Sequence, residues 1–233
     1  MTGTLINIIA ILIGGTLGSL MGDRFPERFR LIFMQALGLL ITALAIDMAL
    51  ETNEFLVVLL AILLGVLLGE WWDIDKRLNH LGVWLEKKAQ RFPILTKGNF
   101  TRGFVASSLI VCIGPLAILG SIQDGLSGDY TLLAIKSAMD FVVTIALGAA
   151  FGFGVVFSAL SILIVQGGMT LGASLVQGLM TEAMIAEFSA TGGVMLMGLG
   201  LTMLEIKRIK VANFLPALFI VPFLVLLWQR LGL

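Results

Sequence analysis

Long apolar stretches separated by short polar connections recur along the whole chain. A helix needs about 20 mostly apolar residues to cross the hydrocarbon core of a bilayer. Stretches of this kind, poor in charge, predict eight transmembrane helices. They fall at about 4–22, 32–50, 55–70, 104–121, 131–149, 153–180, 188–204 and 212–230. The pattern therefore predicts an all-α, polytopic transmembrane helix bundle.

One boundary between predicted helices has to be drawn inside an uninterrupted apolar segment. Residues 141–181 contain no charged side chain, and this length exceeds a single span. The small residues of 148–154 are typical of a turn, so we place the boundary between the fifth and sixth helices there.

Composition supports a membrane protein and excludes several other classes. Hydrophobic residues make up 58% of the 233 residues and charged residues only 13%, against about 25% charged in soluble proteins. Fifteen basic and fifteen acidic residues give no net charge, which excludes a nucleic-acid partner. The single cysteine, Cys112, and the single histidine, His80, exclude disulfide frameworks and Cys- or His-rich metal sites. We expect no cofactor and no metal.

The positions of the basic residues predict the orientation in the membrane. Thirteen of the fifteen Lys and Arg residues lie in the first, third and seventh connections, and only Lys136 and Arg230 lie elsewhere. Cytoplasmic connections carry the excess of basic residues. The odd-numbered connections are thus predicted to be cytoplasmic, and both termini to face outward.

The third connection is the one sizeable polar segment. Within 73–102, Leu78, Leu81, Trp84 and Leu85 recur at helical spacing among basic residues. Such a pattern is typical of an amphipathic helix on the inner membrane surface. We interpret it as a cytoplasmic linker.

Two halves of the chain resemble each other at an offset of 154 residues. The offset pairs Gly14 with Gly168, Thr16 with Thr170, Leu17 with Leu171, Gly18 with Gly172, Ala36 with Ala190, Gly38 with Gly192, Leu50 with Leu204 and Glu51 with Glu205. The predicted topology turns the halves upside down relative to each other, as in many secondary transporters. Chance similarity between glycine-rich helices is the alternative. The predicted segments are a first repeat of three spans (1–72), the linker (73–102), two central spans (103–150) and a second repeat of three spans (151–233).

The fourth and fifth spans carry the densest polar content. Proline removes a backbone donor, so Gly114-Pro115 predicts a break in the fourth span. Non-helical backbone at membrane depth is tolerated only inside protein or beside a water-filled cavity. Lys136 and Asp140 are four residues apart on one helix face and can pair. They are either functional groups or a structural ion pair. Gln123 and Asp124 complete this group of candidates.

Gln166, Gly167 and Thr170 predict an interruption of the sixth span, where freed backbone groups could bind an ion or polar solute. Glycines four residues apart instead favour close helix packing. We assign packing to Gly14, Gly18 and Gly22, and a site to the Gln166 region.

Glu51 and Glu205 are acids related by the repeat, at opposite membrane faces of the predicted topology. They are candidates for a gate. The alternative is that both are solvated acids at the ends of spans.

Several of these residues together resemble a known family. They are the run from Gly114 to Asp129, Lys136-Ser137 with Asp140, Gln166-Gly167 with Thr170-Leu171, Asn213 to Ala217, and Gly3 to Asn7. They are similar to the YqgA/YdfK family of bacterial integral membrane proteins, the domain of unknown function 554. The resemblance covers essentially the whole chain. It implies a bacterial inner-membrane location and supplies no substrate.

The function predicted is transport of an ion or small polar solute, by a carrier or a channel, at a midplane site framed by the fourth to sixth spans. A non-transporting scaffold or sensor subunit is the alternative. An intramembrane enzyme is a weaker one, because Ser121, Asp124 and Asp129 have no histidine near them in the sequence. The expected partners are the lipid bilayer, the solute, and a second copy in a homodimer through glycine-rich faces.

Overall fold

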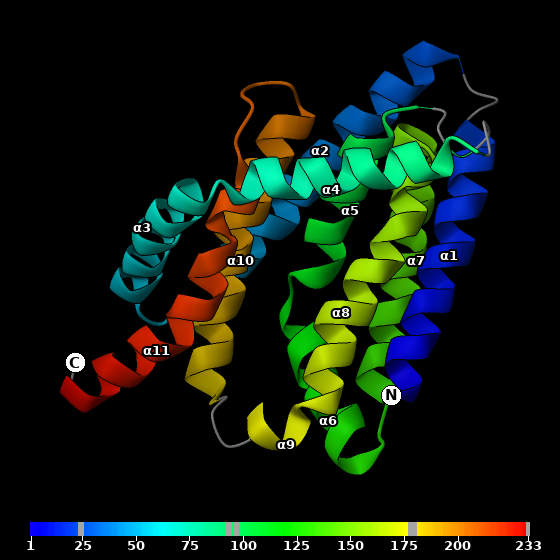
Figure 1. Ribbon diagram of the computed structural model, residues 1–233. Helices are drawn as coiled ribbons and strands as arrows, with labels where there is room; N and C mark the ends of the chain where they lie inside the picture. Colours follow the sequence, from blue (N-terminus) through cyan, green and yellow to red (C-terminus); the bar gives the residue numbers. More distant parts are fainter. Residues whose placement is uncertain (23–25, 92–94, 96–97, 177–180, 232–233) are drawn as a thin grey trace. The chain divides into compact units, whose positions relative to one another are not determined.

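The computed structural model describes residues 1–22, 26–91, 95, 98–176 and 181–231, which are mostly helical (Figure 1). The elements are α1 (Thr2–Gly22), α2 (Glu27–Ala49), α3 (Phe55–Trp72), α4 (Ile74–Ala89), α5 (Phe100–Cys112), α6 (Pro115–Ser127), α7 (Thr131–Phe151), η2 (Phe153–Phe157), α8 (Ser158–Leu171), α9 (Ala173–Val176), α10 (Glu182–Met203), η3 (Val211–Phe214) and α11 (Leu215–Leu231). The all-α class is confirmed.

The number of predicted spans agrees with the helices observed. Within the described residues, seven helical segments are long and apolar enough to cross a membrane, and the bent pair of α5 and α6 makes an eighth candidate. The boundary predicted within 148–154 is present, because α7 ends at Phe151 and Gly152 takes a positive φ of 88°. The end of the predicted sixth span, 177–180, lies outside the described residues.

The chain forms two compact units. Unit 1 comprises residues 1–37 and 79–178, and unit 2 comprises residues 38–78 and 179–233, so that the boundaries fall within α2 and α4. Each unit therefore draws helices from both of the predicted repeats.

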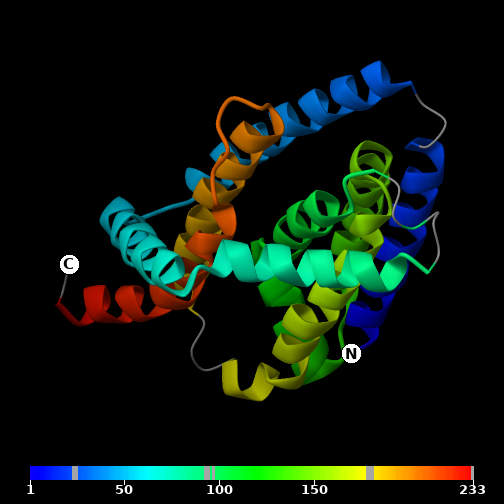
Figure 2. The ribbon, with the colours of Figure 1, turned by 45° about the horizontal axis from the view of Figure 1, so that its top comes forward.

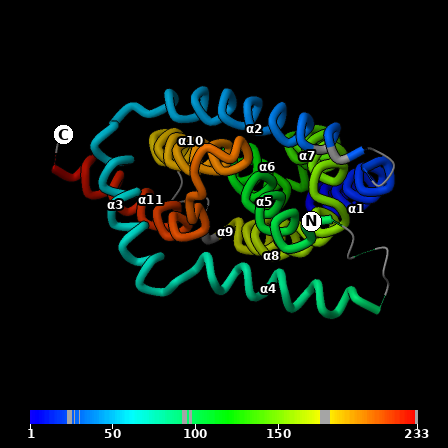
Figure 3. The backbone as a smooth tube through the Cα atoms, turned by 90° about the horizontal axis from the view of Figure 1, so that it is seen from above, coloured from blue at the N-terminus to red at the C-terminus, as the bar shows by residue number. Residues whose placement is uncertain are grey.

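In unit 1, α1 lies along α7 with the glycine face that the sequence assigned to packing (Figure 3). The contacts pair Gly14 with Phe141, Gly18 with Ile145 and Gly22 with Ala149. Both residue numbers rise together, so the two helices are parallel. Glycine permits this close approach, because a Cβ at each position would meet the backbone of α7. This glycine face of α1 is therefore occupied by α7 of the same chain and is not free to bind a second copy.

The helix pair α5 and α6 is bent by 65° between Cys112 and Pro115. At its start, Phe100 packs against Gly154, just beyond the end of α7. Towards its end, Gly120 packs against Leu133, near the beginning of α7. The pair therefore extends along the full length of α7. This placement favours a broken helix that crosses the membrane over a loop that re-enters it.

The parallel arrangement of α1 and α7 supports the same count. Two parallel spans are separated by an odd number of crossings in the chain. If α2 and α3 both cross the membrane between α1 and α7, a third crossing is needed, and the bent pair of α5 and α6 supplies it. Within unit 1, α8 runs antiparallel to α1, since Thr4 lies beside Thr170 and Asn7 beside Gln166. These directions fit eight crossings.

Unit 2 is built from two antiparallel helix pairs. Figure 2 shows α11 beside α3, and the contacts join Gly65 to Ala217 and Gly69 to Asn213. In the other pair, Gly38 of α2 approaches Gly200 of α10, and Gly193 of α10 approaches Ala45 and Ala49 of α2. Small residues again let the helix backbones approach closely.

The segment predicted as an amphipathic linker contains the helix α4. Gly82, Leu85 and Ala89 are buried, and Gly82 contacts Thr101 of α5. Trp84 is exposed. The buried side of α4 therefore consists of small residues and Leu85, and the carboxylate of Glu86 accepts a hydrogen bond from the hydroxyl of Thr101.

Crossing by the bent pair predicts that Asp129 and Lys88 lie on opposite sides of the membrane. In a Cys112→Ala background, single cysteines at these two exposed positions are expected to react with an impermeant maleimide from opposite faces. Labelling of intact and lysed spheroplasts measures this. Labelling of both cysteines from one face would show that α5 and α6 form a re-entrant loop.

The glycine contacts predict opposite effects for two glycine substitutions. At Gly18 an added Cβ meets the carbonyl of Ile145, so Gly18→Ala is expected to destabilise the fold by about 1–3 kcal/mol. At Gly168 no described atom lies within 4 Å of such a Cβ, and alanine favours the helix by up to about 1 kcal/mol. Thermal unfolding of both purified variants in detergent tests this. Equal melting temperatures would contradict the packing role of Gly18.

Candidate functional site

The break between α5 and α6 follows directly from two adjacent residues. Gly114 takes φ 156° and ψ 148°, a conformation that side-chain-bearing residues rarely adopt. Pro115 then begins α6 and has no amide hydrogen to donate to the carbonyl four residues earlier. That carbonyl belongs to Val111, which is fully buried. The break predicted at Gly114-Pro115 is confirmed, and the carbonyl of Val111 is among the backbone acceptors that it leaves in need of a donor.

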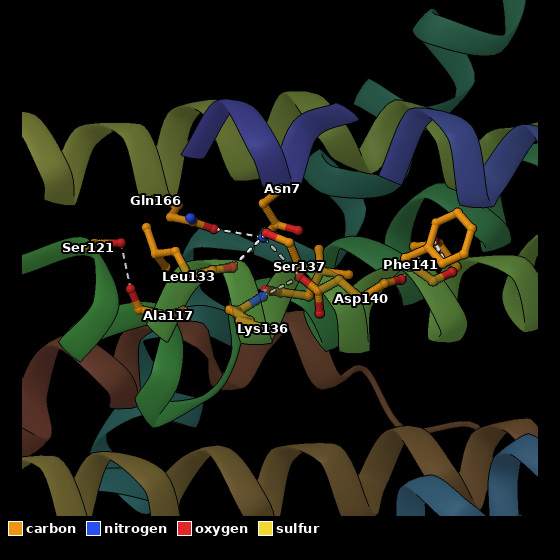
Figure 4. A network of polar contacts seen from close by, with 11 residues as sticks. Asn7, Ala117, Ser121, Leu133, Lys136, Ser137, Asp140, Phe141 and Gln166 are labelled. Atoms are coloured by element: carbon orange, nitrogen blue, oxygen red, sulfur yellow. Dashed lines mark hydrogen bonds and ion pairs between the residues drawn. The ribbon is translucent and has the colours of Figure 1, made fainter. Parts of the chain in front are cut away.

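Lys136 supplies this donor. Its Nζ lies 2.9 Å from the carbonyl oxygen of Val111 and also donates to Oδ2 of Asp140, one turn further along α7 (Figure 4). Both side chains are buried, with exposed fractions of 6% for Lys136 and 7% for Asp140. Asp140 lies about 13 Å along a helix about 30 Å long, close to its middle. The two residues form an ion pair inside unit 1 rather than at a solvated helix end.

Asn7 joins this ion pair to α8. Its Nδ2 donates to Oδ2 of Asp140 at 3.0 Å and to Oε1 of Gln166 at 2.9 Å, so Asn7 lies between them in Figure 4. One turn away, the hydroxyls of Thr4 and Thr170 are 3.2 Å apart. Side chains of α1, α7 and α8 and the broken end of α5 thus meet in one buried group, which we call the polar network: Thr4, Asn7, Val111, Lys136, Asp140, Gln166 and Thr170.

Two atoms of the polar network have no hydrogen-bond partner among the described residues. They are the acceptor Oδ1 of Asn7 and the donor Nε2 of Gln166, on two amides that are bonded to each other. Buried polar atoms in proteins are nearly always paired. An unpaired acceptor and donor on adjacent amides therefore mark a place where an ion, a water or a polar solute can bind.

The predicted interruption of the sixth span at Gln166 to Thr170 is wrong. The helix α8 continues unbroken from Ser158 to Leu171. Two glycines weaken a helix by about 1 kcal/mol each but keep their amide hydrogens, unlike proline, so the backbone bonds persist. Gly167 is buried in ordinary contact with Thr4. Gln166 therefore contributes its side chain to the polar network and no freed backbone.

Gln123 and Asp124 lie in a different place from the ion pair. Oδ2 of Asp124 accepts from the amide of Gly3 at 3.1 Å and lies 3.0 Å from the amino group of Met1. A carboxylate at the beginning of a helix is stabilised by the free amides and the helix dipole. Oε1 of Gln123 is buried and has no partner among the described residues. The carboxylate of Asp124 thus stabilises the beginning of α1.

The three residues considered for an enzyme do not converge. The hydroxyl of Ser121 donates to the carbonyl of Ala117 (Figure 4), and Asp124 contacts the beginning of α1. Asp129 accepts from the hydroxyl and amide of Thr131, and these hydrogen bonds lower the pKa of its carboxyl. Ser121, Asp124 and Asp129 therefore each bond to different partners and not to one another in these hydrogen bonds.

The candidate gate residues are exposed. Glu51 follows α2, and Glu205 follows α10 with a positive φ of 59°. In unit 2, unlike these two exposed residues, Glu187 is a buried acid. The sequence pattern placed it in the connection before the predicted span 188–204. It accepts from the hydroxyl of Thr52 and from the amides of Asn53 and Glu54. It satisfies backbone donors that precede α3, beside a cavity of about 250 Å³ that Trp228 also lines.

Asn7 and Thr4 are members of the polar network that the sequence pattern did not identify. Asn7 is fully buried, and it is the one amide side chain in the uncharged helix α1. An amide in such a position is the signal that could have found it, because polar side chains at membrane depth usually face the protein interior. No group of three or more His, Cys, Asp or Glu residues in the described part of the chain is arranged to hold a metal ion.

The fold and the polar network define a polytopic helical membrane protein with an ion pair buried in its interior. The family model described as "Protein of unknown function (DUF554)" matches residues 2–226. The chain belongs to this family.

Two curated relatives cover nearly the whole chain. The uncharacterized membrane protein YdfK of Bacillus subtilis (strain 168) is 31% identical over 237 residues, which are 100% of this chain and 99% of YdfK. The uncharacterized protein YqgA of Escherichia coli (strain K12) is 32% identical over 222 residues, which are 94% of this chain and 93% of YqgA. No solved structure matches the chain.

The ion pair predicts strong coupling between two substitutions. Lys136→Met or Asp140→Asn alone leaves a buried charge without its partner, and each is expected to cost about 3–5 kcal/mol of unfolding free energy in low-salt buffer. The double variant removes both charges and is expected to recover most of that loss. Denaturant unfolding of the three purified variants measures the coupling. Additive losses in the double variant would contradict a direct pair.

Proposed function

We propose that this protein transports an ion or a small polar solute across the bacterial inner membrane through unit 1. Ions and solutes would bind at the polar network, where Asn7, Gln166 and Thr170 contact them and Lys136 and Asp140 set the local charge. The protein acts in this proposal as a carrier or channel and not as an enzyme.

The observation that carries the proposal is the buried Lys136–Asp140 pair, in which Asp140 lies close to the middle of α7. A charged side chain at the centre of a membrane helix costs at least about 2.5–3.5 kcal/mol, and such residues typically mark ion or substrate pathways. The break at Gly114 lies beside the pair, since Val111 binds Lys136. Broken helices beside buried polar groups are the usual form of a transporter binding site.

The directions of the helices support an inverted repeat. The 154-residue offset relates α1 to α8, α2 to α10, and α3 to α11. In each of these three pairs the helices run antiparallel, as their glycine and polar contacts require. A pseudo-two-fold axis in the membrane plane produces this arrangement. Rocking of one repeat against the other would expose the polar network to each side in turn.

The proposed orientation places both termini outside. Basic residues cluster in connections that would then be cytoplasmic, and α4 would lie at the inner surface. The beginning of α1, with Asp124, would face outward. The polar network would lie between this outer end and the middle of the bilayer.

Flux through proteoliposomes tests the proposed function. Wild-type protein is expected to pass at least one solute from a panel of inorganic ions, amino acids, nucleobases and organic acids. Asn7→Ala and Gln166→Ala are expected to reduce that flux at least tenfold, because each removes a polar contact from the site. Gln90→Ala changes an exposed amide and serves as the matched control.

Normal flux in folded Asn7→Ala and Gln166→Ala would contradict the assignment of the site. A wild-type protein that passes none of the panel would instead support the scaffold or sensor alternative.

A further inference from the structure

The ammonium group of Lys136 donates hydrogen bonds to oxygen atoms on two different helices, α5 and α7. One is the carbonyl oxygen of Val111 at 2.9 Å, and the other is Oδ2 of Asp140. Oδ1 of Asn7 is a further buried oxygen without a partner among the described residues, on the amide that already bonds Asp140. Carbonyl, amide and carboxylate oxygens are the ligands that hard cations take from proteins.

The carbonyl of Val111 is available only because the helix is broken there. In an intact helix it would accept from residue 115, but Pro115 has no amide hydrogen. A buried carbonyl without a donor is costly, so it requires either a hydrogen-bond donor or a cation. Lys136 meets this requirement through a flexible four-carbon stem that ends in a compact positive charge.

We propose that Lys136 is a tethered cation occupying the binding site of a monovalent inorganic cation, such as Na⁺ or K⁺. This inference rests on the proposed function and names its substrate class. When the polar network opens to water, the ammonium moves into that water, and the cation binds the carbonyl of Val111 and the carboxylate of Asp140, with Oδ1 of Asn7 available as a third ligand. When the cation leaves, the ammonium returns.

Charge balance selects the substrate class. Asp140 carries one negative charge, so one monovalent cation balances it as Lys136 does. A divalent cation would leave an excess positive charge in a buried site, and an anion would meet the carboxylate. Both outcomes leave an uncompensated buried charge, which is strongly unfavourable.

Three forms of the protein test the proposal without depending on activity. The wild type retains the ammonium, whereas Lys136→Met removes this tethered competitor and leaves Asp140 and the freed carbonyl in place. Lys136→Met/Asp140→Asn is uncharged and is the matched control, because it retains the break but lacks the carboxylate. The probes are NaCl and KCl against choline chloride at constant ionic strength, and the readout is the melting temperature of purified protein in detergent.

We expect Na⁺ or K⁺ to raise the melting temperature of Lys136→Met saturably. Half-saturation should occur at a concentration at least tenfold lower than in the wild-type protein, where the ammonium competes. The double variant should show no difference between the inorganic cations and choline. If choline stabilises Lys136→Met equally, or if the double variant responds like Lys136→Met, the proposal is overturned.

Uptake of radioactive Na⁺ and Rb⁺ by wild-type proteoliposomes separates this inference from the proposed function. Cation uptake that Asp140→Asn abolishes would support both. Transport of an uncharged solute, together with no cation effect on Lys136→Met, would overturn the cation inference and leave the transport function. A cation effect without any wild-type flux would support the site and contradict the transport function.

Discussion

Pro115 has no amide hydrogen to donate to the carbonyl of Val111, and in the membrane interior no bulk water is present to donate to that carbonyl instead. Every buried backbone group in the hydrocarbon region needs a partner within the protein. The carbonyl of Val111 takes Lys136 as its partner, and the buried ammonium in turn requires a counter-charge, which Asp140 supplies. Asn7 then bonds the carboxylate and reaches Gln166. The break at Gly114-Pro115 is thus the first link in a chain of contacts that joins four helices.

The same contacts explain why the helices of unit 1 approach so closely. The side chains of Asn7 and Asp140 are short, so a hydrogen bond between them requires close backbones. Glycines along α1 permit this approach to α7. Because lipid provides little hydrophobic force between helices, van der Waals contact at such small-residue faces and hydrogen bonds between helices drive their association. Packing and polar contacts therefore depend on each other.

The proposed repeat pairs helices whose environments differ. Gly14 packs against α7, but at Gly168, its counterpart in the proposed repeat, an added Cβ would have no described atom within 4 Å. Gln166 lies in the polar network, and the repeat relates it to an apolar residue, Leu12. The helices paired by the 154-residue offset thus run antiparallel but carry different side chains at the polar network. The polar network does not follow the proposed repeat for this reason.

The sequence by itself determined the membrane class, the eight apolar segments, the break at Gly114-Pro115 and the pairing of Lys136 with Asp140. Each of these depends on local properties: the length of an apolar run, a missing amide hydrogen, or a spacing of four on one helix. Only the tertiary structure decided that Asn7 joins Asp140 to Gln166 and that Asp124 accepts a hydrogen bond from the beginning of α1. These contacts link residues more than 100 positions apart, and the packing of the helices, which local patterns do not encode, selects them.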